Sequence, residues 1–196
     1  MSRLQIVPIA AAAMALAGAA HATIFTFTAD MLGSNENPAN ASPATGFTDV
    51  IFDNVANTMQ VDVTWDGLVG GNPAAAHIHC CIAQGSNVGV AVGFPGFPAT
   101  LSGSYSHLFN LLDATIYTTG FRNTFGGGTA AGSEQALLDG LLAGHAYSNI
   151  HNATFPGGEI RGFLTAVPEP AAWALMLLGF GAIGAGLRRR REMALA

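Results

Sequence analysis

The chain has 196 residues, half of them hydrophobic, and its net charge is −5. Residues 23–166 contain ten carboxylates but only two basic residues, Arg122 and Arg161, so this stretch carries a charge near −8. Such a surface repels phosphates, which excludes nucleic acid as a partner. About 144 residues are enough for one domain with its own core.

The N-terminus has the features of an export signal. Arg3 precedes an apolar stretch over residues 6–20, which ends in the small-residue site Ala20-His21-Ala22. This pattern predicts a signal peptide over residues 1–22, cleaved after Ala22. A first transmembrane helix is the alternative, but the apolar core is short and rich in alanine.

Strands separated by turn residues are expected next. The clearest alternation covers residues 58–65, where Met59, Val61, Val63 and Trp65 alternate with polar residues. This pattern is typical of a half-buried strand, and residues 53–57 predict a hairpin that joins it to the preceding one. The other strands expected in this part of the chain are residues 23–31, 47–52, 74–79, 88–92 and 103–111.

Cys80 and Cys81 are the only cysteines, and they are adjacent in a chain expected to be exported. Their spacing excludes a disulfide that links distant parts of the domain. Four interpretations stay open: a disulfide between neighbours, an intermolecular bridge, soft metal ligands beside His77 and His79, or free buried thiols.

One short helix is predicted between Ser133, a capping residue, and Gly144. Strands over residues 145–152 and 159–164 follow, joined by a turn at residues 155–158. Many short strands with a single helix predict an all-β domain over residues 23–166, an antiparallel Greek-key-like sandwich or barrel with one short helix.

Two of these strands carry histidines at a spacing of two. His77 and His79 lie on one face of their strand, and Tyr147, Asn149 and His151 on one face of another, because side chains two apart point the same way. A His-x-His pair with a third histidine suits copper or zinc. The alternative is structural, with the histidines bonded to loop backbone, to Glu159 or to Asn149. Arg161 and Glu159 are likewise expected to pair with each other, or to flank His151.

The C-terminal tail has three parts in a fixed order. A Pro-Glu-Pro motif precedes 17 uncharged residues, 171–187, and four arginines, 188–191. The uncharged run predicts a transmembrane helix with its arginines in the cytoplasm. The tail resembles the PEP-CTERM sorting signal, which implies cleavage by an exosortase near the motif and release to the cell surface or exterior. A plain membrane anchor is the alternative. The sorting residues implied are Val167, Pro168, Glu169 and Pro170.

The domain resembles the CHRD family. The matching segments are AHIH at residues 76–79, GSYSHLFNLLDA at residues 103–114 and LLAGHAYSNIHNATFPGGEIRGFL at residues 141–164, with Glu36-Asn37-Pro38 near the start. The resemblance implies an all-β secreted module without an established catalytic activity, and the Cys80-Cys81 pair departs from the family pattern.

Two functions are consistent with these patterns. The first is a non-catalytic binding or matrix protein that needs no cofactor and is associated with exopolysaccharide or biofilm, since exosortase systems accompany exopolysaccharide production. The second is an extracytoplasmic copper- or zinc-binding protein, with a redox role as one form of it, that uses His77, His79 and His151. No nucleophile elbow, phosphate loop or zinc-protease motif is present.

Overall fold

The computed structural model describes residues 24–168, 175–181, 183–184 and 188. Nine strands form one sheet, in the order β5-β4-β7-β8-β1-β2-β3-β6, with β9 paired to β1. The strands are β1 (Ile24–Leu32), β2 (Thr45–Asp53), β3 (Thr58–Asp66), β4 (Pro73–Cys80), β5 (Val90–Gly93), β6 (Gly103–Asn110), β7 (Ala146–Asn152), β8 (Ile160–Phe163) and β9 (Thr165–Ala166). The helices are α1 (Thr119–Thr124) and α2 (Ala130–Leu142).

Alternation of apolar and polar residues builds the central hairpin as predicted. In β3, Val61, Val63 and Trp65 are buried, and β2 runs antiparallel beside it with Phe52 opposite Met59. The carboxylate of Asp53 accepts hydrogen bonds from the backbone N–H groups of residues 55 and 56, and this closes the turn. The register therefore places Val50 and Phe52 of β2 on the core face with the buried side chains of β3, whereas Phe47 and Ile51 of β2 lie on the exposed face.

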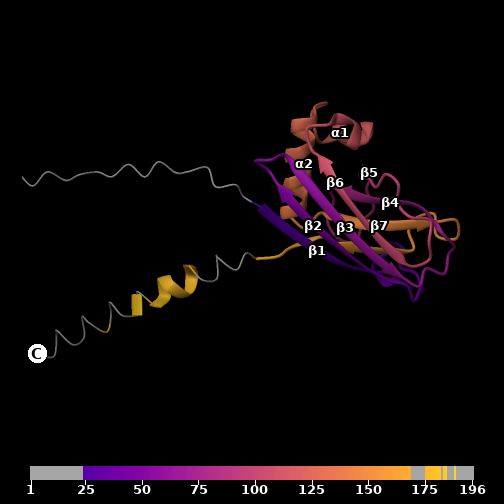
Figure 1. Ribbon diagram of the computed structural model, residues 1–196, viewed down its shortest axis with the longest axis horizontal. Coiled ribbons are helices and arrows are strands. Elements are labelled where there is room, and N and C mark those ends of the chain that lie inside the picture. The colour runs from indigo at the N-terminus through magenta and orange to yellow at the C-terminus, as the bar shows by residue number, and fades with distance from the viewer. Residues whose placement is uncertain (1–23, 169–174, 182, 185–187, 189–196) are drawn as a thin grey trace, which may run out of the picture.

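The antiparallel β architecture is confirmed, but the expected sandwich or barrel is replaced by a single sheet curled into a half-barrel (Figure 1). β5 and β6 are its two outer strands and do not pair with each other. β1 joins the two halves: it pairs with β2 along its whole length, but with β8 only at Leu32 opposite Arg161. This narrow join lets the sheet bend without dividing into two layers.

Within residues 24–168, two α-helices are present where one was expected. α2 begins earlier than predicted, because the hydroxyl of Thr129, rather than that of Ser133, accepts from the N–H of Gly132 and caps the helix. α1 was missed: with six residues it is too short for an apolar periodicity to show. α2 contacts β4, β7 and β9, and its leucines 137, 138 and 141 join the core.

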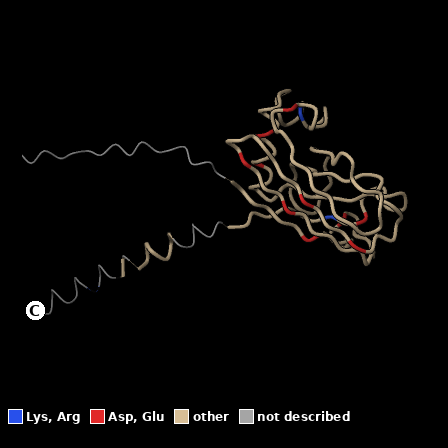
Figure 2. The backbone as a smooth tube through the Cα atoms, in the orientation of Figure 1, with Lys and Arg blue, Asp and Glu red and all other residues tan. Residues whose placement is uncertain are grey.

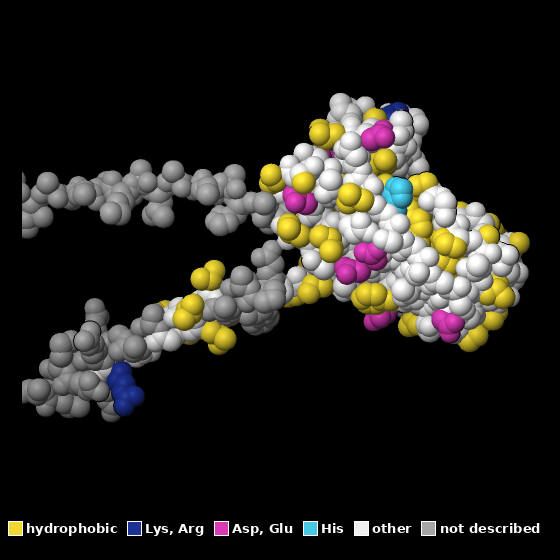
Figure 3. All heavy atoms as spheres, in the orientation of Figure 1, with side chains coloured by type: hydrophobic (Ala, Val, Ile, Leu, Met, Phe, Trp, Pro, Cys, Tyr) yellow, Lys and Arg dark blue, Asp and Glu magenta, His cyan; other side chains and the backbone are white. Residues whose placement is uncertain are grey.

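Charged side chains are sparse over the domain. Acidic residues are scattered along the backbone and very few basic ones accompany them (Figure 2). On the visible face the carboxylates stand singly or in small groups among uncharged atoms (Figure 3). The acidic balance expected from the sequence is thus a property of the folded domain's surface.

The chain leaves the sheet through β9. The backbone N–H of Val167 donates to the carbonyl of Thr26, and Pro168 ends this described part of the chain. Several predicted segments lie outside the described residues: the expected signal peptide over residues 1–22, Glu169 and Pro170, and much of the expected transmembrane segment over residues 171–187. Within that last segment, residues 175–181 are described and are helical. No helix within the described residues has both the length and the apolar character needed to cross a membrane.

Candidate metal centre

Strands β4 and β7 bring three histidines together. In this antiparallel pair His77 lies opposite Asn149 and Ala75 opposite His151, so that His77, His79 and His151 share the face of the sheet away from Ile78 and the core. Each offers one ring nitrogen, and these three atoms lie within 4.8 Å of one another. Their ring centroids are 5.0 to 5.8 Å apart. The structure therefore assembles the trio that the sequence singled out.

Backbone carbonyls orient two of the rings. His79 Nδ1 lies 2.8 Å from the carbonyl oxygen of Val88, and His151 Nδ1 lies 3.0 Å from that of Pro156. A carbonyl only accepts, so each Nδ1 carries the proton and each Nε2 keeps a free lone pair. Within the described chain, both of these Nε2 atoms and His77 Nδ1 are buried without a hydrogen-bond partner. Unsatisfied buried nitrogens are unfavourable by about 1–3 kcal/mol each, and a bound cation would satisfy them.

Burial keeps the trio neutral. Desolvation, reinforced by the neighbouring imidazoles, lowers the pKa of His77 to about 4. Desolvation likewise lowers the pKa of His79 to about 4, against the opposing effect of the Val88 carbonyl, and it lowers the pKa of His151. The three rings are unprotonated at neutral pH, which is the form that coordinates a metal.

The spacing fits one ion after a small contraction. Metal–nitrogen bonds of roughly 2 Å place ligand nitrogens about 3.3–3.5 Å apart in trigonal or tetrahedral geometry. The ligand atoms here lie up to 4.8 Å apart, so the rings must close by up to about 1.4 Å. Three protein ligands would leave a further position for water or another small molecule.

The structural interpretation of the histidines is only partly right. Loop carbonyls do bind His79 and His151, but neither Glu159 nor Asn149 forms a hydrogen bond with an imidazole within the described structure. The Glu159 carboxylate instead accepts from Ser42 Oγ, from Asn152 Nδ2 and from the backbone N–H groups of residues 69 and 70. Asn149 Nδ2 donates to Glu36 at 2.5 Å.

The expected pairing of Arg161 with Glu159 is wrong. β8 begins at Ile160, so Glu159 lies before the strand, and among the described residues the ion pair of Arg161 is with Glu36 instead. Arg161, which is 1% exposed, forms an ion pair with Glu36, Nε to Oε2 3.6 Å, and does not flank His151 in any hydrogen bond. Its Nε donates to the Asn35 carbonyl and its Nη1 to Asn87 Oδ1.

This arginine also reaches the histidine cluster through an aromatic stack. The Arg161 guanidinium carbon lies 4.7 Å from the ring centroid of Tyr147. Tyr147 in turn stacks on His79 at 4.7 Å between centroids, with the rings 8° from parallel. Sequence reasoning missed Glu36 as the partner because it lies far away in the chain. The only available signal was the Glu36-Asn37-Pro38 motif.

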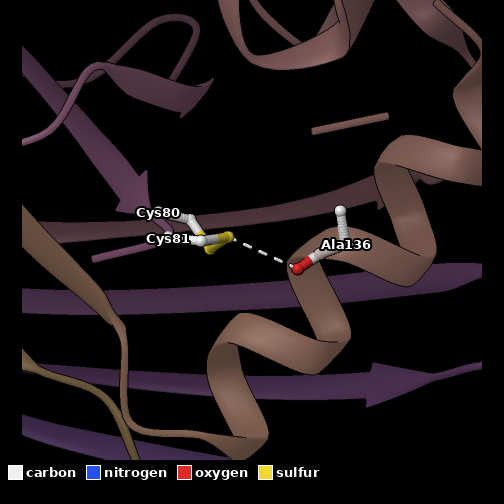
Figure 4. Close-up of a disulfide and its surroundings, with 3 residues drawn as sticks. All are labelled: Cys80, Cys81 and Ala136. Atoms are coloured by element: carbon white, nitrogen blue, oxygen red, sulfur yellow. Dashed lines mark hydrogen bonds between the residues drawn. A yellow bond between two sulfur atoms is a disulfide. The ribbon is translucent and has the colours of Figure 1, made fainter. Parts of the chain in front are cut away.

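Cys80 and Cys81 form a disulfide with each other, one of the arrangements that the sequence left open. The pair lies against α2, where Cys81 Sγ is 3.4 Å from the carbonyl oxygen of Ala136 (Figure 4). The disulfide rules out the intermolecular bridge, the free thiols and the thiolate ligands in this structure. The candidate centre therefore offers nitrogen ligands only.

A cleft of about 520 Å³ adjoins the cluster at His77. It lies between strand β6 and the edge formed by β4 and β5, and its walls include Phe94, Phe109, Tyr117 and His107. His107 had no expected role, and the structure places it in this aromatic wall, apart from the trio.

Comparison with protein families finds two matches. The family model described as the CHRD domain covers residues 27–164, and the PEP-CTERM protein-sorting motif covers residues 166–191. No curated protein and no solved structure matches the chain. Both resemblances inferred from the sequence are thereby confirmed. The protein belongs to the CHRD domain family and carries a PEP-CTERM sorting motif at its C-terminal end.

Proposed function

We propose that this protein binds one copper or zinc ion at the cell surface through His77, His79 and His151. The PEP-CTERM motif marks it as a protein that is exported and sorted to the surface after exosortase processing. The observation that carries the proposal is the cluster of buried imidazole nitrogens without hydrogen-bond partners, all three ligand atoms lying within 4.8 Å. Backbone carbonyls fix the tautomers of the His79 and His151 rings, an arrangement that is common for metal-bound histidines.

The role is one of binding, without turnover. The CHRD domain is not a known enzyme family. In the proposed layout, residues 1–22 are a signal peptide, residues 23–166 the binding domain and residues 167–191 the sorting tail. Residues 171–187 hold the precursor in the inner membrane until an exosortase cuts near Pro168-Glu169-Pro170. The processed protein then joins surface material, with exopolysaccharide or other matrix components as partners.

The test is a metal titration of the full chain, extracted in a mild detergent and stripped with a chelator. We expect about one equivalent of copper or zinc to bind at neutral pH, measured by mass spectrometry of the retained metal. His77→Ala combined with His79→Ala should abolish binding, because a single remaining imidazole is a weak ligand.

His145→Ala serves as the matched control, since His145 is exposed and lies outside the trio. It should retain the full equivalent of metal. Equal metal content in the double variant and in the control would overturn the proposed site. So would a wild-type protein that retains no metal while remaining folded.

A further inference from the structure

We infer that this centre selects a monovalent ion, Cu(I), over divalent ions, and that Arg161 is the residue that sets this preference. The inference rests on the proposed metal site and adds the oxidation state of the metal. It follows from the charge of the ligands and the charge of their surroundings.

The ligands supply no negative charge. All three are neutral imidazoles, and the only cysteines of the chain are oxidised to a disulfide. The outer partners of His79 and His151 are backbone carbonyls rather than the carboxylates that often support zinc-bound histidines. A dication in such a site keeps its full charge, and its desolvation penalty grows with the square of that charge.

The surroundings add positive charge. Two stacking steps of 4.7 Å each, from Arg161 to Tyr147 and from Tyr147 to His79, place the guanidinium within about 10 Å of the His79 ring. Its ion-pair partner Glu36 offsets this charge only in part, because burial raises the pKa of that carboxyl to about 7 and leaves it partly protonated at neutral pH.

The surrounding contacts hold this charge in place. Arg161 bonds to Asn35 and Asn87, in two separate loops, and those loops are joined by bonds from Asn37 to the Gly85 carbonyl and from Asn87 to the Asn37 carbonyl. The second loop ends at Val88, whose carbonyl orients His79. The guanidinium therefore stays in place when a cation arrives, and the part of its charge that Glu36 does not offset repels the bound ion.

Ligand number permits Cu(I) without selecting it, because three histidines with an open fourth position also occur in catalytic zinc sites. Imidazole suits copper as well as zinc, so the choice between them falls to charge. A singly charged ion is repelled less than a dication by a nearby fixed cation, which favours Cu(I) here.

The experiment compares affinities for the two ions in the full chain. Cu(I), kept reduced by ascorbate, which leaves disulfides intact, is measured by competition with a chromophoric Cu(I) chelator. Zn(II) is measured by competition with a chromophoric zinc chelator in the same buffer. We expect Cu(I) to bind at least about a hundredfold more tightly than Zn(II). The potential of the bound copper couple should also lie above that of the aqueous couple.

The variant Glu36→Gln/Arg161→Met tests the role of Arg161 without leaving a buried carboxylate unpaired. Removing the uncompensated part of the guanidinium charge relieves the repulsion of a dication more than that of a monocation, so we expect the ratio of Cu(I) to Zn(II) affinity to fall several-fold. Glu36→Gln alone keeps the guanidinium and should preserve or raise the ratio. Loss of loop order alone would weaken both ions alike and leave the ratio unchanged.

The outcomes separate this inference from the proposed site. Binding of neither ion would overturn the site itself. Binding of both ions, with Zn(II) equal to or tighter than Cu(I), would leave the site standing and overturn the selectivity. An unchanged ratio in the double variant, with both ions still bound, would overturn the role of Arg161.

Discussion

Protonation of His77 and His79 links the candidate centre to the stability of the metal-free protein. Burial lowers the pKa of both side chains to about 4 from an ordinary 6.5. Between these values the unfolded chain takes up protons that the folded chain does not. Their contribution to stability is therefore complete above pH 6.5 and is lost as the pH falls toward 4.

We predict that the free energy of unfolding attributable to this pair falls by about 2 kcal/mol between pH 7 and pH 4.5, less than the full shifts imply because His77 is partly exposed. The measurement is urea unfolding in the presence of a chelator, for wild type and for His77→Asn/His79→Asn. The difference between the two proteins should shrink at low pH.

The wild type must be compared with the double histidine variant because Glu36 also changes protonation in this pH range. Burial raises its pKa to about 7 from 4.5, although Arg161 opposes the shift. Its contribution is present below pH 4.5 and is lost as the pH rises through 7, opposite in sign to that of the histidines. Because Glu36 is unchanged in the double variant, its effect cancels in the difference. A difference that does not depend on pH would contradict the assignment to His77 and His79.

At the scale of elements, α2 packs on the disulfide through a glycine. A Cβ atom at Gly140 would lie 2.2 Å from Cys80 Sγ and 2.7 Å from Cys81 Sγ. Glycine inside a helix costs about 1 kcal/mol relative to alanine, so its presence here is explained by this close approach. α2 can lie this close to the end of β4 only because residue 140 has no side chain.

Gly140→Ala should therefore destabilise the protein by about 2–3 kcal/mol despite the better helix propensity. Gly120→Ala in α1 is the matched control, because a Cβ there meets nothing within 4 Å. It should be neutral or stabilising by up to about 1 kcal/mol. The melting temperatures of both variants, measured by thermal unfolding, test this prediction. Equal melting temperatures would show that α2 can shift away from the disulfide.

The two faces of β3 should differ in their tolerance of an introduced charge. Val63 is 1% exposed in the core, whereas Thr64, the next residue, points to solvent. Val63→Asp buries an unpaired charge and should cost several kcal/mol, while Thr64→Asp should change stability by less than about 1 kcal/mol. Denaturant unfolding monitored by circular dichroism tests this, and similar losses in both variants would be inconsistent with the one-sided burial of β3.

For the whole molecule, processing at both ends is the main expectation. Protein recovered from the cell surface should lack residues 1–22 and residues 171–191. Pro168→Ala combined with Glu169→Ala should block the second cut, because it removes the motif that the exosortase recognises. Intact-mass measurement distinguishes the forms, and Thr165→Ala is a control outside the motif. A surface protein that retains its C-terminus would support a plain anchor.

Most of the individual elements could be predicted from the sequence because their signals are local. The strand at β3 follows from an alternation of period two, and α2 from a row of leucines, although Thr129 rather than the predicted Ser133 caps the helix. The pairs His77–His79 and Cys80–Cys81 were visible for the same reason. The short α1 was not, since six residues are too few to show a period.

The amino-acid sequence by itself determined the family, the sorting motif, the antiparallel strands and the histidines that face one way on β4 and β7. Only the tertiary structure decided that the sheet curls without closing, that Arg161 pairs with Glu36, and that Glu159 accepts hydrogen bonds from loop residues. It also decided which nitrogens of the trio are buried without partners. Local patterns report interactions between near neighbours, whereas strand order and buried pairs depend on the sum of contacts between segments far apart in the chain.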